Sequence, residues 1–207
     1  MQLIGMLDSP YVRRVAISLH VMGLPFEHRA VSVFSTFEQF RAINPVVKAP
    51  SLVCDDGEVL MDSTLILDWA DALAPQRSLM PKDPAQRQHA LRIVGLALAA
   101  CEKSVQIVYE QELRPAERRH QPWLDRIHGQ LHAAYAALET ELARAALQPG
   151  GSQAAISSAV AWQFTQALLA GVVPVQAHPV LQALSGASEA LPAFLAFPPD
   201  GPGVPPL

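Results

Sequence analysis

The residues best suited to chemistry lie in a single stretch, Asn44–Ser63. Within it, Pro50 favours an extended conformation for Ala49, and the bond that joins them is one where a cis peptide is least unfavourable. An extended Ala49 would leave its N–H and C=O groups free to pair with a small peptide as an added strand. Asp62 and Ser63 then begin a helix, which brings a carboxylate, a hydroxyl and backbone donors to the same edge. We therefore expect a site for a small zwitterionic peptide.

The elements that position these residues are predicted from apolar patterns and turn residues. Two short apolar strands, Ser51–Cys54 and Glu58–Met61, flank a turn at Asp55-Asp56-Gly57, where glycine accepts a positive φ. The order over residues 1–75 is β-α-β-α-β-β-α, with the first two strands parallel and the last two in a hairpin. The other predicted elements are strand Gln2–Met6, a helix that Ser9 caps and that runs from Pro10 to a stop at Gly23, strand Pro25–Ser32, helix Thr36–Ile43 and helix Ser63–Leu73.

The composition changes after the first 75 residues. Ala74–Pro84 is rich in proline and charge, which suits a linker, and beyond it alanine and leucine dominate while strand patterns vanish. We place a first domain at 1–75, a linker at 76–84 and an all-α domain with a proline-rich tail at 85–207. The predicted helices are Pro84–Leu113, Pro122–Leu147, Gln153–Ala170, Pro179–Leu184 and Glu189–Leu195, followed by an irregular surface tail at Pro198–Leu207. The third of them is apolar around its circumference and is expected at the centre of a bundle.

The bulk composition excludes several classes of protein. The chain has 207 residues, of which 50% are hydrophobic, yet no apolar run reaches the ~18–20 residues that span a bilayer. The first residues lack the pattern of a signal peptide, so we expect a cytosolic protein that does not bind membranes. Cys54 and Cys101 cannot build a disulfide framework and match no zinc spacing. A net charge of −4 argues against a general nucleic-acid binder.

Three linked motifs carry a family resemblance: Ser9–Arg14 (SPYVRR), Asn44–Leu52 (NPVVKAPSL) and Asp55–Ser63 (DDGEVLMDS). Their order and spacing resemble those of the bacterial cytosolic glutathione S-transferases, strongly over residues 1–75 and only in architecture beyond residue 85. The resemblance implies an α/β thioredoxin-like N-terminal domain followed by an all-α helical bundle, and a homodimer. In the thioredoxin frame, Ser9 stands where the first redox cysteine would be, so protein disulfide exchange is not expected.

The resemblance also implies how the tripeptide glutathione would be bound. Asp62 would accept its ammonium group, and Ser63 with the helix start would hold its γ-glutamyl carboxylate. Lys48 would reach the glycyl carboxylate, and Ala49, followed by Pro50, would pair through its backbone. Two alternatives stay open: Asp62 and Ser63 form a plain helix cap, and Lys48 is a solvated surface charge.

The thiol of glutathione must ionise before it attacks an electrophile, and a free thiol titrates near ~8.5. Ser9, at the start of a helix, could donate a hydrogen bond to the thiolate and stabilise it at neutral pH. The alternative is that Ser9 is only an N-cap, since the two roles compete for one hydroxyl. Tyr11 is a second candidate, as donor or as a wall of the substrate site.

The second substrate is expected between the two domains, where its site is weakly specified. For every candidate wall residue, packing in the core is the alternative. The candidates are Val105, Val108, Tyr109 and Trp162.

Other features depart from the family pattern or suggest metals. The family usually has glutamate where Asp62 stands. It also has an N-capping box at the third C-terminal helix, which we place at 155–158, with Ser158 in the position of the aspartate. His128 and His132 lie four residues apart on a helix and could share a metal, but no third ligand is evident, so no metal is expected.

We therefore predict a glutathione S-transferase that conjugates the glutathione thiolate to a small hydrophobic electrophile, as in detoxification, with Ser9 as the catalytic residue. One alternative is a non-catalytic relative that serves regulation through its surface, resembling the stringent starvation regulators that bind RNA polymerase. Another is a glutathione-dependent peroxidase or dehalogenase with the same binding site. The intact Ala49-Pro50 and Asp62-Ser63 pairs favour ligand binding over the regulatory alternative.

Overall fold

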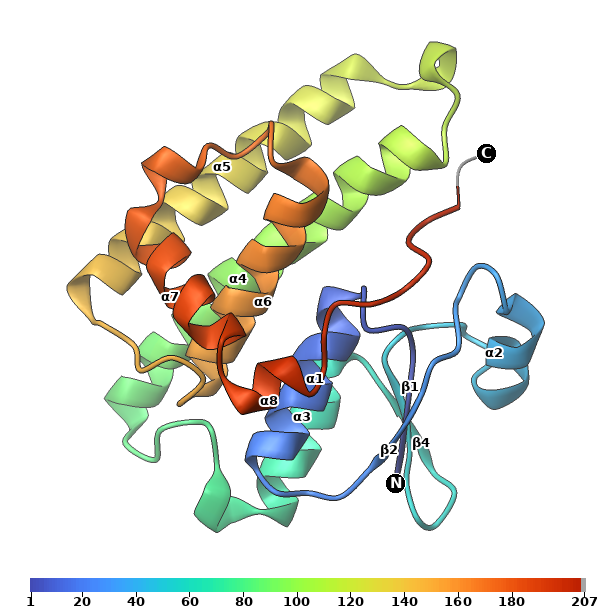
Figure 1. Ribbon diagram of the computed structural model, residues 1–207, viewed down its shortest axis with the longest axis vertical. Coiled ribbons are helices and arrows are strands. Elements are labelled where there is room, and N and C mark those ends of the chain that lie inside the picture. Colours follow the sequence, from blue (N-terminus) through green and yellow to red (C-terminus); the bar gives the residue numbers. More distant parts are fainter. Residues whose placement is uncertain (206–207) are drawn as a thin grey trace. The chain divides into compact units, whose positions relative to one another are not determined.

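The computed structural model describes residues 1–205 and divides into two compact units (Figure 1). The first unit contains Met1–Leu79 together with Pro192–Gly203. The second contains Met80–Leu191 and the described residues after Gly203. The C-terminal segment therefore returns to the N-terminal unit, whereas the sequence placed all of 85–207 in the second domain.

The N-terminal unit is built on a four-stranded sheet in the order β2-β1-β3-β4. β1 (Gln2–Ile4) pairs in parallel with β2 (Glu27–Arg29) and antiparallel with β3 (Ser51–Val53), which forms a hairpin with β4 (Val59–Met61). The parallel pair and the hairpin are as predicted. With the helices below, they confirm a thioredoxin-like βαβαββα unit.

Both faces of this sheet are covered by helices, and the strand alternation decides which residue meets which helix. Leu3 lies in the larger core with α1 (Pro10–Val21) and α3 (Ser63–Leu73). Its neighbour Ile4 lies in a smaller core with Phe40 of α2 (Phe37–Ile43). A 3-10 turn, η1 (Pro75–Arg77), and the short helix α8 (Pro192–Leu195) complete the unit, and Figure 1 shows α8 in red beside α1 in blue.

The second unit is a helical bundle. Its elements are α4 (Pro84–Glu112), η2 (Ala116–Arg118), α5 (Gln121–Arg144), α6 (Gln153–Leu169), η3 (Val175–Ala177) and α7 (Pro179–Glu189). α6 is buried around most of its circumference and packs against α4 and α7, which confirms the central helix expected at Gln153–Ala170.

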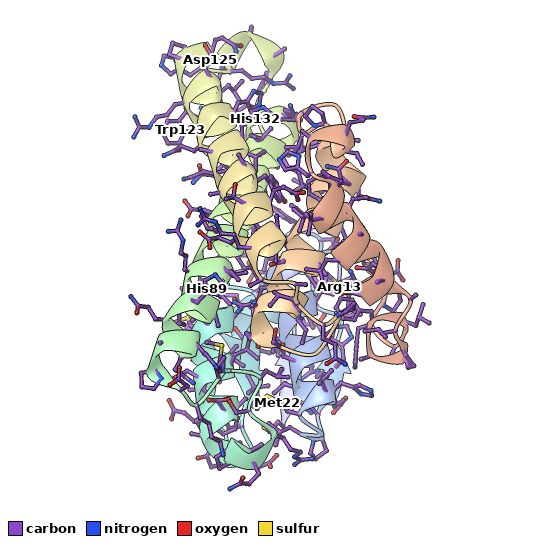
Figure 2. The ribbon with its side chains drawn as sticks, turned by 90° about the vertical axis from the view of Figure 1, so that its left-hand side faces the viewer. Arg13, Met22, His89, Trp123, Asp125 and His132 are labelled. Atoms are coloured by element: carbon purple, nitrogen blue, oxygen red, sulfur yellow. The ribbon has the colours of Figure 1, made fainter. Side chains whose placement is uncertain are left out.

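Two glutamates of α5 tie the bundle together. Glu139 accepts hydrogen bonds from the N–H groups of Val180 and Leu181, at 2.8 and 2.9 Å, and so caps the start of α7 from a neighbouring helix. Glu141 is buried and accepts from Nε of Arg92 at 2.8 Å and pairs with His89 at 3.1 Å (His89 is labelled in Figure 2). These hydrogen bonds lower the pKa of the Glu141 carboxyl below its ordinary value.

Two sequence predictions for the C-terminal half need correction. α7 runs to Glu189, so a helix at Glu189–Leu195 exists only as α8 from Pro192. α6 is capped by Ser152, whose Oγ accepts from Ala155 N–H, while Ser158 is buried within the helix with no partner for its hydroxyl among the described residues. The tail is irregular and mostly exposed over 198–205, as predicted, and through Gly203 it belongs to the first unit. Its last two residues lie outside the described range.

Over the described part of the chain, none of the helices has the length and apolarity that crossing a membrane requires.

Candidate functional site

Helix α1 begins directly after Ser9, as the Ser-Pro pair predicts. Ser9 is the N-cap, its backbone is extended (φ −72°, ψ 121°), and its Oγ accepts a hydrogen bond from the N–H of Val12 at 3.4 Å. Because the cap uses the oxygen as an acceptor, the hydroxyl proton is still available for donation. The two roles considered for Ser9 therefore use different capacities of one group, and its half-buried side chain can fill both.

The loop before β3 is organised by the buried Asn44. Its Nδ2 donates to Oγ of Ser51 at 2.8 Å and its Oδ1 accepts from the N–H of Val46 at 3.0 Å. Oγ of Ser51 in turn donates to the carbonyl of Lys48 at 2.8 Å. Within this loop Val47 has a φ of 53°, a rare conformation for a β-branched residue. Such residues persist where the surroundings over-determine them, and they cluster at ligand sites.

The peptide bond between Ala49 and Pro50 is cis and leads directly into β3. Over residues 1–205, neither the N–H nor the C=O of Ala49 makes a hydrogen bond. Gly5, with a φ of +142°, makes room for this turn: a Cβ there would lie 2.5 Å from Cγ2 of Val12 and 3.4 Å from Cβ of Ala49. Gly5 thus lets the side chains of Val12 and Ala49 lie close to the chain at this point, while the backbone N–H and C=O of Ala49 are available to an added strand.

Asp62 is the N-cap of α3 and has a φ of 71°. Its Oδ1 accepts from the N–H of Thr64 at 2.9 Å, so the capping role considered for Asp62 is observed. Its Oδ2 lies 3.9 Å from Nζ of Lys48, and the two side chains are 44% and 51% exposed. An ion pair this exposed contributes little to stability. Its importance is that it places an anion and a cation, each open to solvent, at the same edge.

Ser63 begins α3 and is only 2% exposed. Its Oγ accepts from Nη1 of Arg14 at 2.9 Å, and the same nitrogen lies 3.3 Å from Oγ1 of Thr64. Arg14 is itself 2% exposed, so its charge lies beneath the start of α3, where the helix dipole is also positive. As at Ser9, the serine oxygen accepts from the protein and the proton is available for an anion.

Arg14 and Asn44 are the site residues that sequence reasoning missed. Both stand in the motifs that carry the family resemblance, Ser9–Arg14 and Asn44–Leu52, but neither was given a role of its own. A signal for Arg14 exists in the sequence: two consecutive arginines stand in the first turns of α1, where the helix dipole disfavours cations. Arginines kept in that position need partners elsewhere in the fold.

The candidate walls of the second-substrate site differ in their surroundings. Trp162 is 1% exposed, and its Nε1 donates to a glutamine of α7. Val108 is also buried, so both residues pack in the core and do not line an open site. Val105 is half-buried and Tyr109 is exposed, both on α4. Tyr11 is half-buried in the first turn of α1, beside Ser9 in sequence.

The histidine pair on α5 was considered as a possible metal site. His132, labelled in Figure 2, is exposed one turn after the half-buried His128. Within residues 1–205 no cluster of three or more His, Cys, Asp or Glu side chains could hold a metal ion.

Comparison with known proteins adds to this geometry. The family model for the glutathione S-transferase N-terminal domain matches residues 3–78. A glutathione transferase family member from Pseudomonas fluorescens Pf-5, solved with bound S-(propanoic acid)-glutathione, is 31% identical over the whole of both chains with a TM-score of 0.83. The GST-like protein YibF of Escherichia coli K12 is 28% identical over 139 residues, 67% of this chain and 68% of YibF. Maleylpyruvate isomerase from Pseudomonas aeruginosa PAO1 is 25% identical over 99% of this chain and all of that one, with a TM-score of 0.71. For the curated relatives compared, the matched region is 36% to 68% of their own length.

Proposed function

The chain belongs to the glutathione S-transferase family, and we propose that it binds glutathione in its N-terminal unit and conjugates the thiolate to a small hydrophobic electrophile. One observation carries this proposal: at the starts of both α1 and α3, a serine hydroxyl accepts from the protein and has a proton left to donate. A peptide that presents a thiolate to Ser9 and a carboxylate to Ser63 matches that pair of donors.

Ser9 is the proposed catalytic residue. Its hydroxyl donates to the sulfur, and the positive end of α1 adds to the stabilisation, so that the thiol ionises near neutral pH. The sulfur then attacks the electrophilic carbon, a C–S bond forms, and the leaving group departs with its electron pair. The thiol proton passes to solvent.

The remaining groups hold the tripeptide. The N–H and C=O of Ala49, beside Pro50, pair with its backbone, and the γ-glutamyl carboxylate binds at Ser63 above the charge of Arg14. The ammonium of the ligand binds Oδ2 of Asp62, whose other oxygen caps α3. In the free protein, Oδ2 of Asp62 lies near the amine of Lys48. When glutathione binds, this amine turns to the glycyl carboxylate.

A second candidate reaction is favoured by the similarity to maleylpyruvate isomerase. An activated thiolate can add to a conjugated carbon–carbon double bond and leave again after rotation, with no net consumption of glutathione. Both reactions need the same thiolate, so the site described here supports either. They differ in the acceptor, which is why the assay below includes both kinds.

A homodimer is also part of the proposal, as is a place in the cytoplasm. On the N-terminal unit, apolar side chains at β4 and α3 are exposed: Met61 by 37%, Leu65 by 64% and Leu73 by 50%. A second copy that covers this face would remove apolar area from water. Light scattering at micromolar concentration would give the mass of two chains, and Leu65→Glu should reduce it to one.

The test of the proposed function is calorimetric titration of glutathione, with the ultraviolet absorbance of the thiolate followed from pH 5 to 10. Binding with a thiol pKa well below ~8.5 supports the proposal, and turnover of an aryl halide or of maleylpyruvate then selects between conjugation and isomerisation. S-methylglutathione is the control, because it fills the peptide site and has no thiol to ionise. Absence of binding at millimolar glutathione would refute the proposal and favour the regulatory alternative.

A further inference from the structure

The C-terminal segment Pro192–Gly203, here called the strap, follows helix α1 back to its first residues. Phe194 is buried on α1 and lies beneath the guanidinium of Arg13, 5.6 Å from Cζ to the ring centroid (Arg13 is labelled in Figure 2). Nε of Arg13 donates to the carbonyl of Phe197 at 2.8 Å. The ring of Phe197 stacks on Phe26 and meets His20 edge-on, with centroids 5.6 and 5.5 Å apart. The strap is therefore anchored along α1 by aromatic and charged contacts.

The end of the strap is bound to Asp8, the residue before the proposed thiolate donor. The N–H of Asp8 donates to the carbonyl of Asp200 at 3.1 Å, and the N–H of Gly203 donates to Oδ2 of Asp8 at 2.8 Å. Between them, Gly201 lies so close to the Asp8 carboxylate that a Cβ there would collide with Oδ2. A side chain at residue 201 would therefore force the Asp8 carboxylate or the strap to move.

The Asp8 carboxylate lies beside N–H donors and a second carboxylate, that of Asp200. Burial raises the pKa of Asp8, and the negative charge of Asp200 raises it further. The N–H groups of Gly203 and Ser9 lower it. The strap therefore bonds to both the N–H and the carboxylate of Asp8, the residue that precedes Ser9 in the chain. The other charged groups of the segment, Arg13 and His20, contact Phe194 and Phe197 further along α1.

We propose that the strap is a positioning element for the thiol site, and that Asp8 couples it to Ser9. The proposal rests on the proposed function, since Ser9 has a site to serve only if glutathione binds. The strap holds the turn before α1 so that the hydroxyl of Ser9 and the helix start face the sulfur. The charge of Asp8, next to the donor, acts in the opposite sense by disfavouring a thiolate.

Two substitutions separate the geometric effect from the charge effect. Asp8→Asn keeps an acceptor for Gly203 and removes the charge, so the strap stays in place and the pKa of bound glutathione falls by roughly half a unit, as expected for one nearby charge removed. Gly201→Ala displaces the strap from Asp8, so the pKa of the bound thiol rises toward the free value of ~8.5. Gly171→Ala is the matched control, because a Cβ at Gly171 meets nothing within 4 Å.

Amide hydrogen exchange and the thiolate titration are measured on the same proteins. Gly201→Ala should speed exchange of the Val12 and Arg13 amides, which bond to Ser9, by roughly tenfold, while Asp8→Asn and the control leave it unchanged. Opposite shifts of the thiol pKa in the two variants would support the proposal. Faster exchange in Gly201→Ala with no pKa shift would overturn the coupling and leave the strap a structural contact. Unchanged exchange in Gly201→Ala would show that the strap does not hold the start of α1, whether or not glutathione binds. If the unaltered protein binds no glutathione, the proposed function fails, and the role of the strap at a thiol site fails with it.

Discussion

Replacing Ser9 with alanine tests the central chemical claim, because the structure predicts two separate losses. The first is the helix cap: the hydrogen bond from Val12 to Oγ is long, at 3.4 Å, so the free energy of unfolding should fall by only about 0.5 kcal/mol. The second is the hydrogen bond to the thiolate, which as a charge-assisted bond contributes about 1.5–3 kcal/mol. Divided by 1.36 kcal/mol per unit, that loss raises the pKa of the bound thiol by about 1–2 units.

The effect on rate depends on pH, and its form is specific to this mechanism. At pH 7 the thiolate fraction should fall roughly tenfold or more, but a thiolate of higher pKa is also more nucleophilic, by roughly three- to tenfold over this range. The pH profiles of kcat/KM for the two proteins should therefore cross, with Ser9→Ala slower near neutral pH and equal or faster near pH 9.5. The affinity for S-methylglutathione should stay nearly the same.

The assay is a stopped-flow or steady-state pH profile with an aryl halide, beside the ultraviolet titration of bound glutathione. Ser9→Thr is the control, because threonine keeps both the cap and the hydroxyl proton. A pH profile in Ser9→Ala that runs parallel to the unaltered one, with only the loss of unfolding free energy, would refute the catalytic role. Ser9 would then be a helix cap and no more.

Three further predictions follow from other contacts. Asp62→Asn keeps an acceptor for the N–H of Thr64 and loses the charge, so the dissociation constant of glutathione should rise roughly tenfold. This is the lower end of the range for losing a charge-assisted hydrogen bond, because the Asp62 side chain is 44% exposed to solvent. If calorimetry shows an unchanged affinity for glutathione, Asp62 is only the N-cap of α3. Glu139→Gln leaves one N–H at the start of α7 without its carboxylate, so urea unfolding should show a loss of about 1 kcal/mol; no loss would mean that the cap is dispensable. The hydrogen bond from Arg92 lowers the pKa of Glu141 in the folded protein. The contribution of Glu141 to the free energy of unfolding is therefore present above the ordinary carboxyl pKa and is lost as the pH falls through the folded pKa. Glu141→Gln should make the free energy of unfolding depend less on pH in acid, and an unchanged acid dependence would contradict this assignment.

Local signals in the sequence were sufficient wherever a residue and its partner are close along the chain. The Ser-Pro pair gave the start of α1, and the predicted helix Ser63–Leu73 has the observed bounds of α3. Strand lengths were less accurate: the strand predicted over Gln2–Met6 ends at Ile4, because Gly5 turns the chain with a φ of +142°. These are consequences of neighbouring residues, which a pattern along the chain can capture.

Contacts between distant residues could not be read in the same way. Arg14 meets Ser63 across 49 positions, and Asp8 meets Gly203 across 195. Nothing in the periodicity of α1 distinguishes an arginine in solvent from one buried beneath another helix start. The tail after Pro198 is irregular and exposed, as its prolines predict, but its hydrogen bond from the N–H of Gly203 to the Asp8 carboxylate could not be predicted from the sequence. Lack of secondary structure is therefore no measure of how firmly a segment is held.

In the proposed site, the two serines would favour anions although each hydroxyl is neutral. A hydroxyl in water can turn its proton or its lone pairs toward a ligand, so alone it discriminates little. At Ser9 and Ser63 the protein donates to one of the two lone pairs of the oxygen, from Val12 and from Arg14, and the proton stays free to donate to a ligand. Both hydroxyls also stand at positive helix ends. A thiolate and a carboxylate satisfy this arrangement at once, whereas a thiol or an amide satisfies it only in part. In the proposed site, preference for the ionised sulfur would come from the free hydroxyl protons together with the positive helix ends, which are in place before any ligand binds.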